Sequence, residues 1–268
     1  MISSALHDAM HNLLRAVSDQ IILPHYQTLS AAQITQKAPD DLVTIADTLA
    51  EDMIYEGLSK IMPSLPIVGE EAAHANPALL DLLGGDCWIV DPIDGTNNFA
   101  QAKPPFGILI AMASGGEAQT GWIYDPLSAR LCSACRGKGA FIGEDRIFAR
   151  TSAMQPPIAA ISTLFMDQAQ RAAMERHIAP HYQLVDIPRC AAEQYPRLAL
   201  GINDVSIFER TLAWDHAAGA LWLNEAGGKA ARLDGSPYRV DEHDRTGLIG
   251  AASPALWDSL AARLELLD

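Results

Sequence analysis

A twelve-residue stretch, residues 88–99, constrains this chain more than any other feature. It reads Trp-Ile-Val-Asp-Pro-Ile-Asp-Gly-Thr-Asn-Asn-Phe. The apolar start predicts the end of a buried strand. Because Pro92 has a fixed φ and no N–H to donate, we expect the strand to stop there. Asp91 and Asp94 then lie three residues apart on a tight, stiff turn.

This turn combines groups with opposite preferences for a ligand. Gly95 accepts backbone conformations that other residues avoid, and Thr96 is a favourable N-cap, so a helix is expected to begin here. The free N–H groups of a helix N-terminus attract anions, whereas Asp91 and Asp94 repel them. A divalent cation reconciles the two, because carboxylates hold the cation and both cation and N–H groups hold a phosphate. For an Asp-x-x-Asp pair alone, an ordinary capped and solvated junction is the alternative.

The composition is that of an acidic globular protein. The chain has 268 residues, 49% of them hydrophobic, which allows one large domain or two joined ones. Its formal net charge is −14, and no run of Lys and Arg forms a basic stripe. We therefore expect no nucleic-acid partner. An acidic enzyme acting on phosphates needs a local source of positive charge, which again favours a metal.

The sequence also bears on location and cysteine chemistry. No stretch of about 20 apolar residues is present, and residues 1–12 lack a charged-then-apolar signal layout, so we expect a cytoplasmic protein without a membrane span. Cys132 and Cys135 have the spacing of a redox or zinc motif, but no second pair accompanies them. Two small buried residues on a strand are the favoured interpretation.

The first half is predicted to pack two helices on an antiparallel sheet. Apolar residues at helical spacing predict helices over residues 4 to about 29 and about 42 to 61, the second capped by Asp40 or Asp41. Residues 66–71 predict a strand that ends in the acidic pair Glu70 and Glu71. Short apolar runs between residues 106 and 142, separated by turns, predict antiparallel hairpins.

The second half is predicted to be a smaller, mixed α/β unit. The segment Gln155-Pro156-Pro157 is the best boundary, so we divide the chain into residues 1–150 and 151–268. Beyond it, strands and helices alternate, as in crossover units. The expected strands are 158–162, 183–187, 204–208, 229–232 and 247–252, and the expected helices are 167–179, 191–200, 214–226 and 254–266.

Four separate patterns then match one family in chain order. They are Lys-x₃-Asp-Leu-Val-Thr-x₂-Asp from Lys37, Gly-Glu-Glu from Gly69, Asp-Pro-Ile-Asp-Gly-Thr-x-Asn-Phe from Asp91, and Trp-Asp-x-Ala-Ala-Gly with Glu-Ala-Gly-Gly from Trp214. The chain thereby resembles the inositol monophosphatase family. The resemblance implies the layered αβαβα sandwich of the superfamily that also contains fructose bisphosphatase.

The resemblance also implies hydrolysis of a phosphate monoester with two or three Mg²⁺ ions. The implied metal ligands are Glu70, Asp91, the carbonyl of Ile93, Asp94 and Asp215. Glu70 and Thr96 would hold the attacking water, and Asp47 would accept its proton through Thr96. The implied substrate-binding residues are Asp94, Gly95, Thr96, Arg189, Cys190, Ala191 and Asp215, and Lys37 would lie at the periphery of the metal site.

The leaving-group pocket departs from the family pattern. Residues 189–192 read Arg-Cys-Ala-Ala, where inositol-specific members carry Gly-[Ser/Thr]-Ala-Ala. Phe208 stands where members that hold inositol hydroxyls carry Glu, and Glu209 follows it. A shift by one residue on a strand reverses the side that a residue faces, so Glu209 is a doubtful substitute.

Two interpretations of Arg189 stay open on the sequence. It either meets a second anionic group of the substrate or pairs with Asp186 or Glu193 without touching substrate. The default substrate is therefore myo-inositol monophosphate or a related polyol or sugar phosphate, with histidinol phosphate or a sugar bisphosphate as alternatives. A regulatory protein that binds RNA or a transcription factor is the alternative from another class. We expect a small phosphorylated metabolite as partner, and a homodimer as in many relatives.

Overall fold

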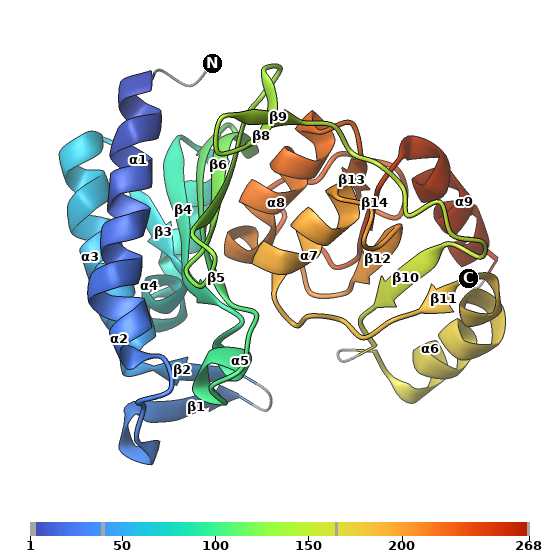
Figure 1. Ribbon diagram of the computed structural model, residues 1–268, viewed down its shortest axis with the longest axis horizontal. Coiled ribbons are helices and arrows are strands. Elements are labelled where there is room, and N and C mark those ends of the chain that lie inside the picture. The colour runs from blue at the N-terminus through green and yellow to red at the C-terminus, as the bar shows by residue number, and fades with distance from the viewer. Residues whose placement is uncertain (1–3, 39–40, 164–165, 267–268) are drawn as a thin grey trace.

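Five alternating layers of helices and sheets build the protein (Figure 1). The computed structural model describes residues 4–38, 41–163 and 166–266. A seven-stranded and a five-stranded sheet form two of the layers. The helices form the other three: α1 (Ser4–Val17) with α3 (Ile45–Ile61), α7 (Ala191–Ala199) with α8 (Ala213–Glu225), and α6 (Gln168–Ala173) with α9 (Pro254–Leu264). This arrangement confirms the predicted αβαβα sandwich.

The first half carries the seven-stranded sheet, in the order β3-β4-β5-β6-β7-β8-β9. Neighbouring strands are antiparallel except β3 and β4, which are parallel. The bounds are β1 Ile34–Ala38, β2 Asp41–Thr44, β3 Ile67–Gly69, α4 Glu70–Ala75, β4 Cys87–Asp94, α5 Thr96–Ala100, β5 Gly107–Ser114, β6 Glu117–Asp125, β7 Arg130–Cys135, β8 Gly139–Ile142 and β9 Asp145–Ile147. The first predicted helix is α1, which continues through a π-helical turn, Ser18–Ile22, into α2 (Leu23–His25).

The second predicted helix begins three residues later than expected. Residues 41–44 pair with β1 as a strand, and Thr44 is the N-cap of α3. Its side chain accepts from the N–H of Ala46 at 3.2 Å, and the side chain of Asp47 completes a capping box. The expected cap by Asp41 was therefore wrong, and Asp40 lies outside the described residues.

The central strand also differs from its prediction. β4 does not stop at Pro92 but continues to Asp94, through a shift in register against β5 between Asp91 and Asp94. A bulge of this kind leaves a backbone position unpaired, so proline's missing N–H costs little there. The helix that follows is capped by Gly95 at φ 85°, and Thr96 is its first residue rather than its cap.

The second half folds as its alternating pattern predicts. Its five-stranded sheet has the order β11-β10-β12-β14-β13 and mixes parallel and antiparallel neighbours. The strands are β10 Ile158–Ile161, β11 Gln183–Leu184, β12 Val205–Phe208, β13 Lys229–Ala231 and β14 Leu248–Ala251. Each expected strand and helix after residue 157 has a counterpart, with ends that differ by a few residues.

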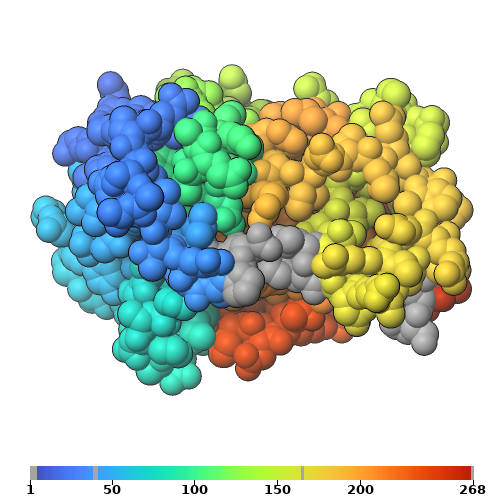
Figure 2. Space-filling model, turned by 90° about the horizontal axis from the view of Figure 1, so that it is seen from below, coloured from blue at the N-terminus to red at the C-terminus, as the bar shows by residue number. Residues whose placement is uncertain are grey.

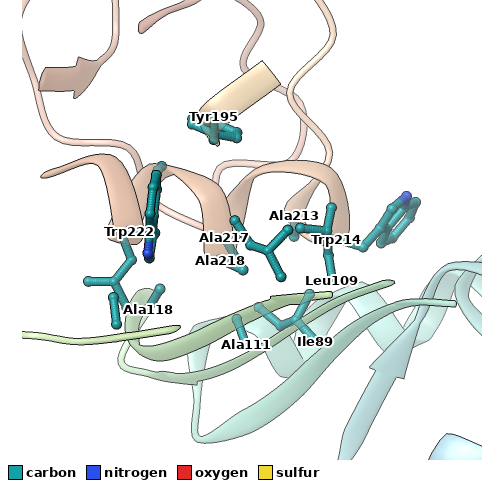
Figure 3. Packing of buried hydrophobic residues seen from close by; sticks show 14 of the residues in the cluster. Ile89, Leu109, Ala111, Ala118, Tyr195, Ala213, Trp214, Ala217, Ala218 and Trp222 are labelled. Atoms are coloured by element: carbon teal, nitrogen blue, oxygen red, sulfur yellow. The ribbon is translucent and has the colours of Figure 1, made fainter. Parts of the chain in front are cut away.

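Helix α8 lies between the two sheets and carries the core (Figure 3). Ala217 and Ala218 face the first sheet, where Gly121 lets β6 approach closely: a Cβ at Gly121 would lie 2.9 Å from Cα of Ala218. On the opposite side, Gly219 makes room for the ring of Tyr195 from α7. Small residues at these positions therefore allow α8 to approach its neighbours closely.

The two halves share this core. Residues from both, such as Ile89 and Trp222, belong to one hydrophobic cluster. Seen from below, the blue and cyan atoms of the first half lie at one end of the molecule and the yellow atoms of the second half at the other, with green and orange atoms adjoining between them (Figure 2). The proposed boundary at residues 150 and 151 falls between β9 and β10. In the described parts of the chain, no helix has the length and apolar character needed to cross a membrane.

Candidate active site

Three aspartates from distant parts of the chain meet at the end of β4. Asp91 and Asp94 come from the irregular end of this strand, and Asp215 comes from the first turn of α8. One carboxylate oxygen from each lies within 4.8 Å of the others. Asp91 is 1% exposed, and its Oδ1 meets no hydrogen-bond donor among the described residues. An anionic oxygen buried without a donor is unfavourable unless a cation binds it.

The titration of these groups reflects the same crowding. Burial, together with repulsion from Glu70 and the other carboxylates, raises the pKa of Asp91 well above its ordinary value. Burial and repulsion from Asp215 raise the pKa of Asp94 to about 7. All donors in the cluster are hard carboxylate oxygens, which suit Mg²⁺ rather than a softer metal.

Glu70 lies outside this group of three and contacts a lysine. Nζ of Lys37 lies 3.2 Å from Oε1 of Glu70 and 2.7 Å from Oε1 of Glu71. The lysine side chain is 6% exposed, so it offsets the repulsion between two adjacent acids in a poorly solvated place. Burial nevertheless raises the pKa of Glu70, and the charge of Asp215 adds to the effect.

Glu51 fixes the start of the helix that carries Glu70. Its two carboxylate oxygens accept from the N–H groups of Glu71 and Ala72, each at 2.9 Å. Gly69 makes room for this contact, since a Cβ there would lie 2.5 Å from the Glu51 carboxylate. Glu51 lies one turn after Asp47 on α3, and the sequence gives no signal for this capping role.

A hydrogen-bonded chain joins Asp47 to the turn after β4. The N–H and hydroxyl of Thr44 donate to Oδ2 of Asp47 at 2.8 and 2.6 Å. Oγ1 of Thr96 lies 3.1 Å from Oδ1 of Asp47 and 2.9 Å from the carbonyl oxygen of Ile93. Burial raises the pKa of Asp47 to about 7, while the bonds from Thr44 act against the rise.

The N-terminus of α7 contacts the same cluster. The N–H of Ala192 donates to Oδ2 of Asp94 at 2.6 Å, and Sγ of Cys190 lies 3.7 Å from the carbonyl oxygen of Asp94. At Gly95 a Cβ would lie 3.0 Å from the carbonyl oxygen of Pro105 and 3.2 Å from Cβ of Cys190. Glycine is needed there for space as well as for its positive φ.

A pocket opens beside the aspartates, between α7, β12 and the start of α8. Its walls include Asp94, Asn97, Ser162, Arg189, Cys190, Ala191, Gln194, Phe208, Glu209, Arg210 and Asp215. Arg189 and Glu209 thus both border the pocket. Glu193, one expected partner of Arg189, is bound by Arg130 at 2.7 Å and by Arg197 at 2.8 Å.

The structure thus brings the predicted site residues into one region. Glu70, Asp91, Asp94 and Asp215 approach the turn that carries Ile93, Gly95 and Thr96, with Asp47 beneath it and Cys190 and Ala191 at the pocket wall. Their roles as ligands and catalysts stay predictions. The sequence missed Arg210, which belongs to no motif, and the buried pair of Tyr195 and His216 behind it.

Comparison with known proteins agrees with the family resemblance of the sequence motifs. Residues 6–266 match the inositol monophosphatase family. The chain is 32% identical to an inositol-1-monophosphatase of Bacillus subtilis over 213 residues, which cover 78% of this chain and 79% of that protein. It is 29% identical to Nus factor SuhB of Escherichia coli over 272 residues, with 98% of both proteins covered.

Solved structures agree with the fold. The extragenic suppressor protein SuhB of Bartonella henselae superimposes with a TM-score of 0.81 at 27% identity, over 98% of this chain and 99% of that one. Since some relatives are called Nus factors rather than enzymes, the expectation that nucleic acid is no partner gains no support. The match along nearly the whole chain, on a phosphatase fold with its acidic cluster in place, shows that this protein belongs to the inositol monophosphatase family.

Proposed function

We propose that the protein hydrolyses phosphate monoesters with Mg²⁺ as its cofactor. The observation that carries this proposal is the cluster of the buried Asp91 and Asp94 with the half-buried Asp215, in which Oδ1 of Asp91 lacks a donor among the described residues. Three carboxylates at this separation are stabilised by a hard cation and destabilised by one another without it.

The residues that would hold the cofactor are Glu70, Asp91, the carbonyl of Ile93, Asp94 and Asp215. When bound, Mg²⁺ supplies a lowered pKa for coordinated water and compensates charge on the phosphate and on the leaving oxygen. Two or three ions are expected from the family resemblance.

Thr96 and Asp47 would orient the attacking water and accept its proton. The Thr96 hydroxyl has one proton, and the carboxylate of Asp47 and the carbonyl of Ile93 both lie within its reach. When it donates to Asp47, its lone pairs are free to accept from a water molecule and to aim that water at phosphorus. Asp47 is itself held by Thr44, so the direction of this relay is fixed.

The turn after β4 would bind the phosphate. The backbone N–H groups of Gly95 and Thr96 can donate to phosphate oxygens, and the αL conformation of Gly95 at φ 85° sets their direction. Positioning and electrostatic stabilisation then supply most of the rate, as is general for phosphoryl transfer.

Phosphate release from a substrate panel tests the proposal. The panel holds myo-inositol 1-phosphate, histidinol phosphate, fructose 1,6-bisphosphate and glycerol 2-phosphate, each with Mg²⁺ and with EDTA. We expect Mg²⁺-dependent release, with myo-inositol phosphate or a related polyol or sugar phosphate as the default substrate. Release that continues at full rate in EDTA, or a folded protein inactive on the whole panel, would contradict the proposal.

A second candidate function is regulatory, through binding of RNA or a transcription factor. It is favoured by the 29% identity to Nus factor SuhB along 98% of both chains. The net charge of −14 opposes direct contact with RNA. A gel shift at physiological salt would test it, with tight RNA binding as the supporting result. A homodimer and a cytoplasmic location remain predictions.

A further inference from the structure

We propose that the pocket beside the aspartates accepts a leaving group that carries a second anionic group, and that Arg210 is the residue that recognises it. This inference rests on the proposed function, since it names the substrate class of the same site.

The pocket adjoins the acidic cluster directly. Asp94 and Asp215 form part of its wall, and the wall then extends over Phe208 and Ser162 into the second half of the chain. A phosphate held at the turn after β4 would therefore direct its ester oxygen, and the group attached to it, into this pocket.

Two arginines contribute positive charge to the wall of the pocket. Its charged lining residues are Arg189 and Arg210, together with Glu209 and the proposed metal ligands Asp94 and Asp215. Nη2 of Arg210 lies 4.0 Å from Oδ2 of Asp215, and the arginine side chain is 42% exposed. The guanidinium therefore lies at the edge of the acidic cluster, is partly exposed, and belongs to a residue of the pocket wall.

A hydrogen bond from a buried histidine holds the backbone of Arg210 in place. Nε2 of His216 lies 3.1 Å from the carbonyl oxygen of Arg210, and Nδ1 lies 2.8 Å from the hydroxyl of Tyr195. Because a carbonyl only accepts, His216 donates through Nε2, and its Nδ1 accepts from the tyrosine. His216 is 2% exposed, so the bond is sheltered from water. This hydrogen bond therefore fixes the position of the backbone from which the Arg210 side chain extends.

Phe208 completes the selective surface. Its ring stacks on Tyr195 at 5.4 Å and meets His216 edge-on at 4.9 Å, and it borders the pocket without any polar atom in its side chain. It offers no partner to a polyol hydroxyl. The guanidinium of Arg210 binds a carboxylate or phosphate with two parallel hydrogen bonds, which a hydroxyl cannot match.

A matched pair of substrates tests the inference. Glycerol 2-phosphate and 2-phosphoglycerate differ only in that a CH₂OH group of the first is a carboxylate in the second. We expect kcat/KM with Mg²⁺ to be about tenfold higher for 2-phosphoglycerate, the size of one charge-assisted contact. Arg210→Gln should remove most of this preference, measured as the ratio of the two kcat/KM values within the same variant. Arg15→Gln, on the exposed face of α1, is the control and should preserve the preference.

Binding measured separately from turnover distinguishes the two ideas. Calorimetric Kd values for both compounds, with Ca²⁺ in place of Mg²⁺, give the preference even in a protein that hydrolyses neither. Preferential binding that Arg210→Gln removes, without turnover, would support the subsite and contradict the proposed function. Turnover of both compounds at equal kcat/KM, or a preference unchanged in Arg210→Gln, would overturn the subsite. Equal or absent binding without turnover would overturn both.

Discussion

The two sides of the site are built differently. On the metal side, regular elements carry the acidic groups, and backbone or lysine contacts hold several of them: Ala192 donates to Asp94, and Lys37 contacts Glu70. On the pocket side, Arg189 and Arg210 lie between regular elements, and Arg189 has a φ of 53°, in the left-handed region. The proposed metal ligands thus lie on helices and strands, whereas the two arginines of the pocket lie in the segments that connect them.

The positive φ of Arg189 is compatible with the glycine that, by the family resemblance, inositol-specific members carry at this position. A positive φ costs a non-glycine residue free energy that glycine does not lose. Arg189 therefore adopts a less favourable backbone conformation and places a cation beside the pocket. Substitutions on the two sides should affect rate and selectivity separately.

The largest effect is expected from Asp94→Asn, on the metal side. Losing one ligand charge should raise the activation free energy by several kcal/mol, which lowers kcat/KM about a thousandfold or more, with the fold retained. Asparagine still offers an oxygen to the N–H of Ala192, and removal of one buried charge should leave the metal-free protein as stable as the wild type or more so. Circular dichroism checks the fold, and phosphate release checks activity. Asp86→Asn, at an exposed position just before β4, is the matched control. Normal turnover in Asp94→Asn would remove the metal assignment.

Glu51→Ala should reduce both stability and rate. It leaves the N–H groups of Glu71 and Ala72 without their acceptor, which costs about 1–3 kcal/mol of unfolding free energy. Since Glu70 begins the same helix, kcat should also fall, by about tenfold. Urea unfolding and steady-state kinetics measure the two effects. The exposed neighbour Asp52→Ala should change neither. If both variants behave alike, Glu51 does not position Glu70.

The stability of the metal-free protein should depend on pH in a defined direction. Asp47 and Asp94 both have a pKa of about 7 in the folded protein, above the ordinary value of 3.8. Groups with a raised pKa stabilise the fold when protonated, so this contribution is lost as pH rises through about 7. Burial lowers the pKa of His216 from its ordinary 6.5 to about 3, so this histidine destabilises the fold as pH falls below about 6.5. That histidine opposes the change below about pH 6.5, but the two carboxyls outweigh it, so Tm in EDTA should fall as pH rises from about 4 to 7 and level off above about 7.

Saturating Mg²⁺ should flatten this dependence, because the cation takes the place of the protons. Asp94→Asn should flatten it in part without metal. A metal-free Tm that rises over the same pH range would show that the buried carboxylates do not govern it.

The smallest change in overall rate is expected from Arg189→Gly, on the pocket side. It should alter relative kcat/KM across the substrate panel by about three- to tenfold while total activity on the best neutral ester stays within about twofold. Glycine suits the positive φ at this position, so loss of fold is not expected. Unchanged relative kcat/KM values would return Arg189 to a structural role.

Local patterns predicted most of the fold, and long-range contacts account for what they missed. Helical and strand spacing identified the elements, and the four motifs identified the residues around Asp94. The cap of α3 was misplaced because residues 41–44 pair with β1, a choice that the spacing of the helix does not encode. Strand β4 passes Pro92 because a bulge against β5 absorbs the missing donor.

The missed residues have the same origin. Glu51 caps a helix that begins 19 positions later in the chain, as its bonds to Glu71 and Ala72 show. Arg210 reaches the pocket because α8 places Asp215 and His216 beside it. Neither contact leaves a periodic signal, so neither follows from one sequence.

Calorimetric titration of Mg²⁺ into the wild type and into Asp94→Asn tests the central claim most directly. If the buried aspartates form the cofactor site, the wild type binds at least one Mg²⁺ with measurable heat, and Asp94→Asn binds it about tenfold or more weakly, while Asp86→Asn binds as the wild type does. Equal Mg²⁺ affinity in the wild type and Asp94→Asn, or no binding to the folded wild type, would contradict it.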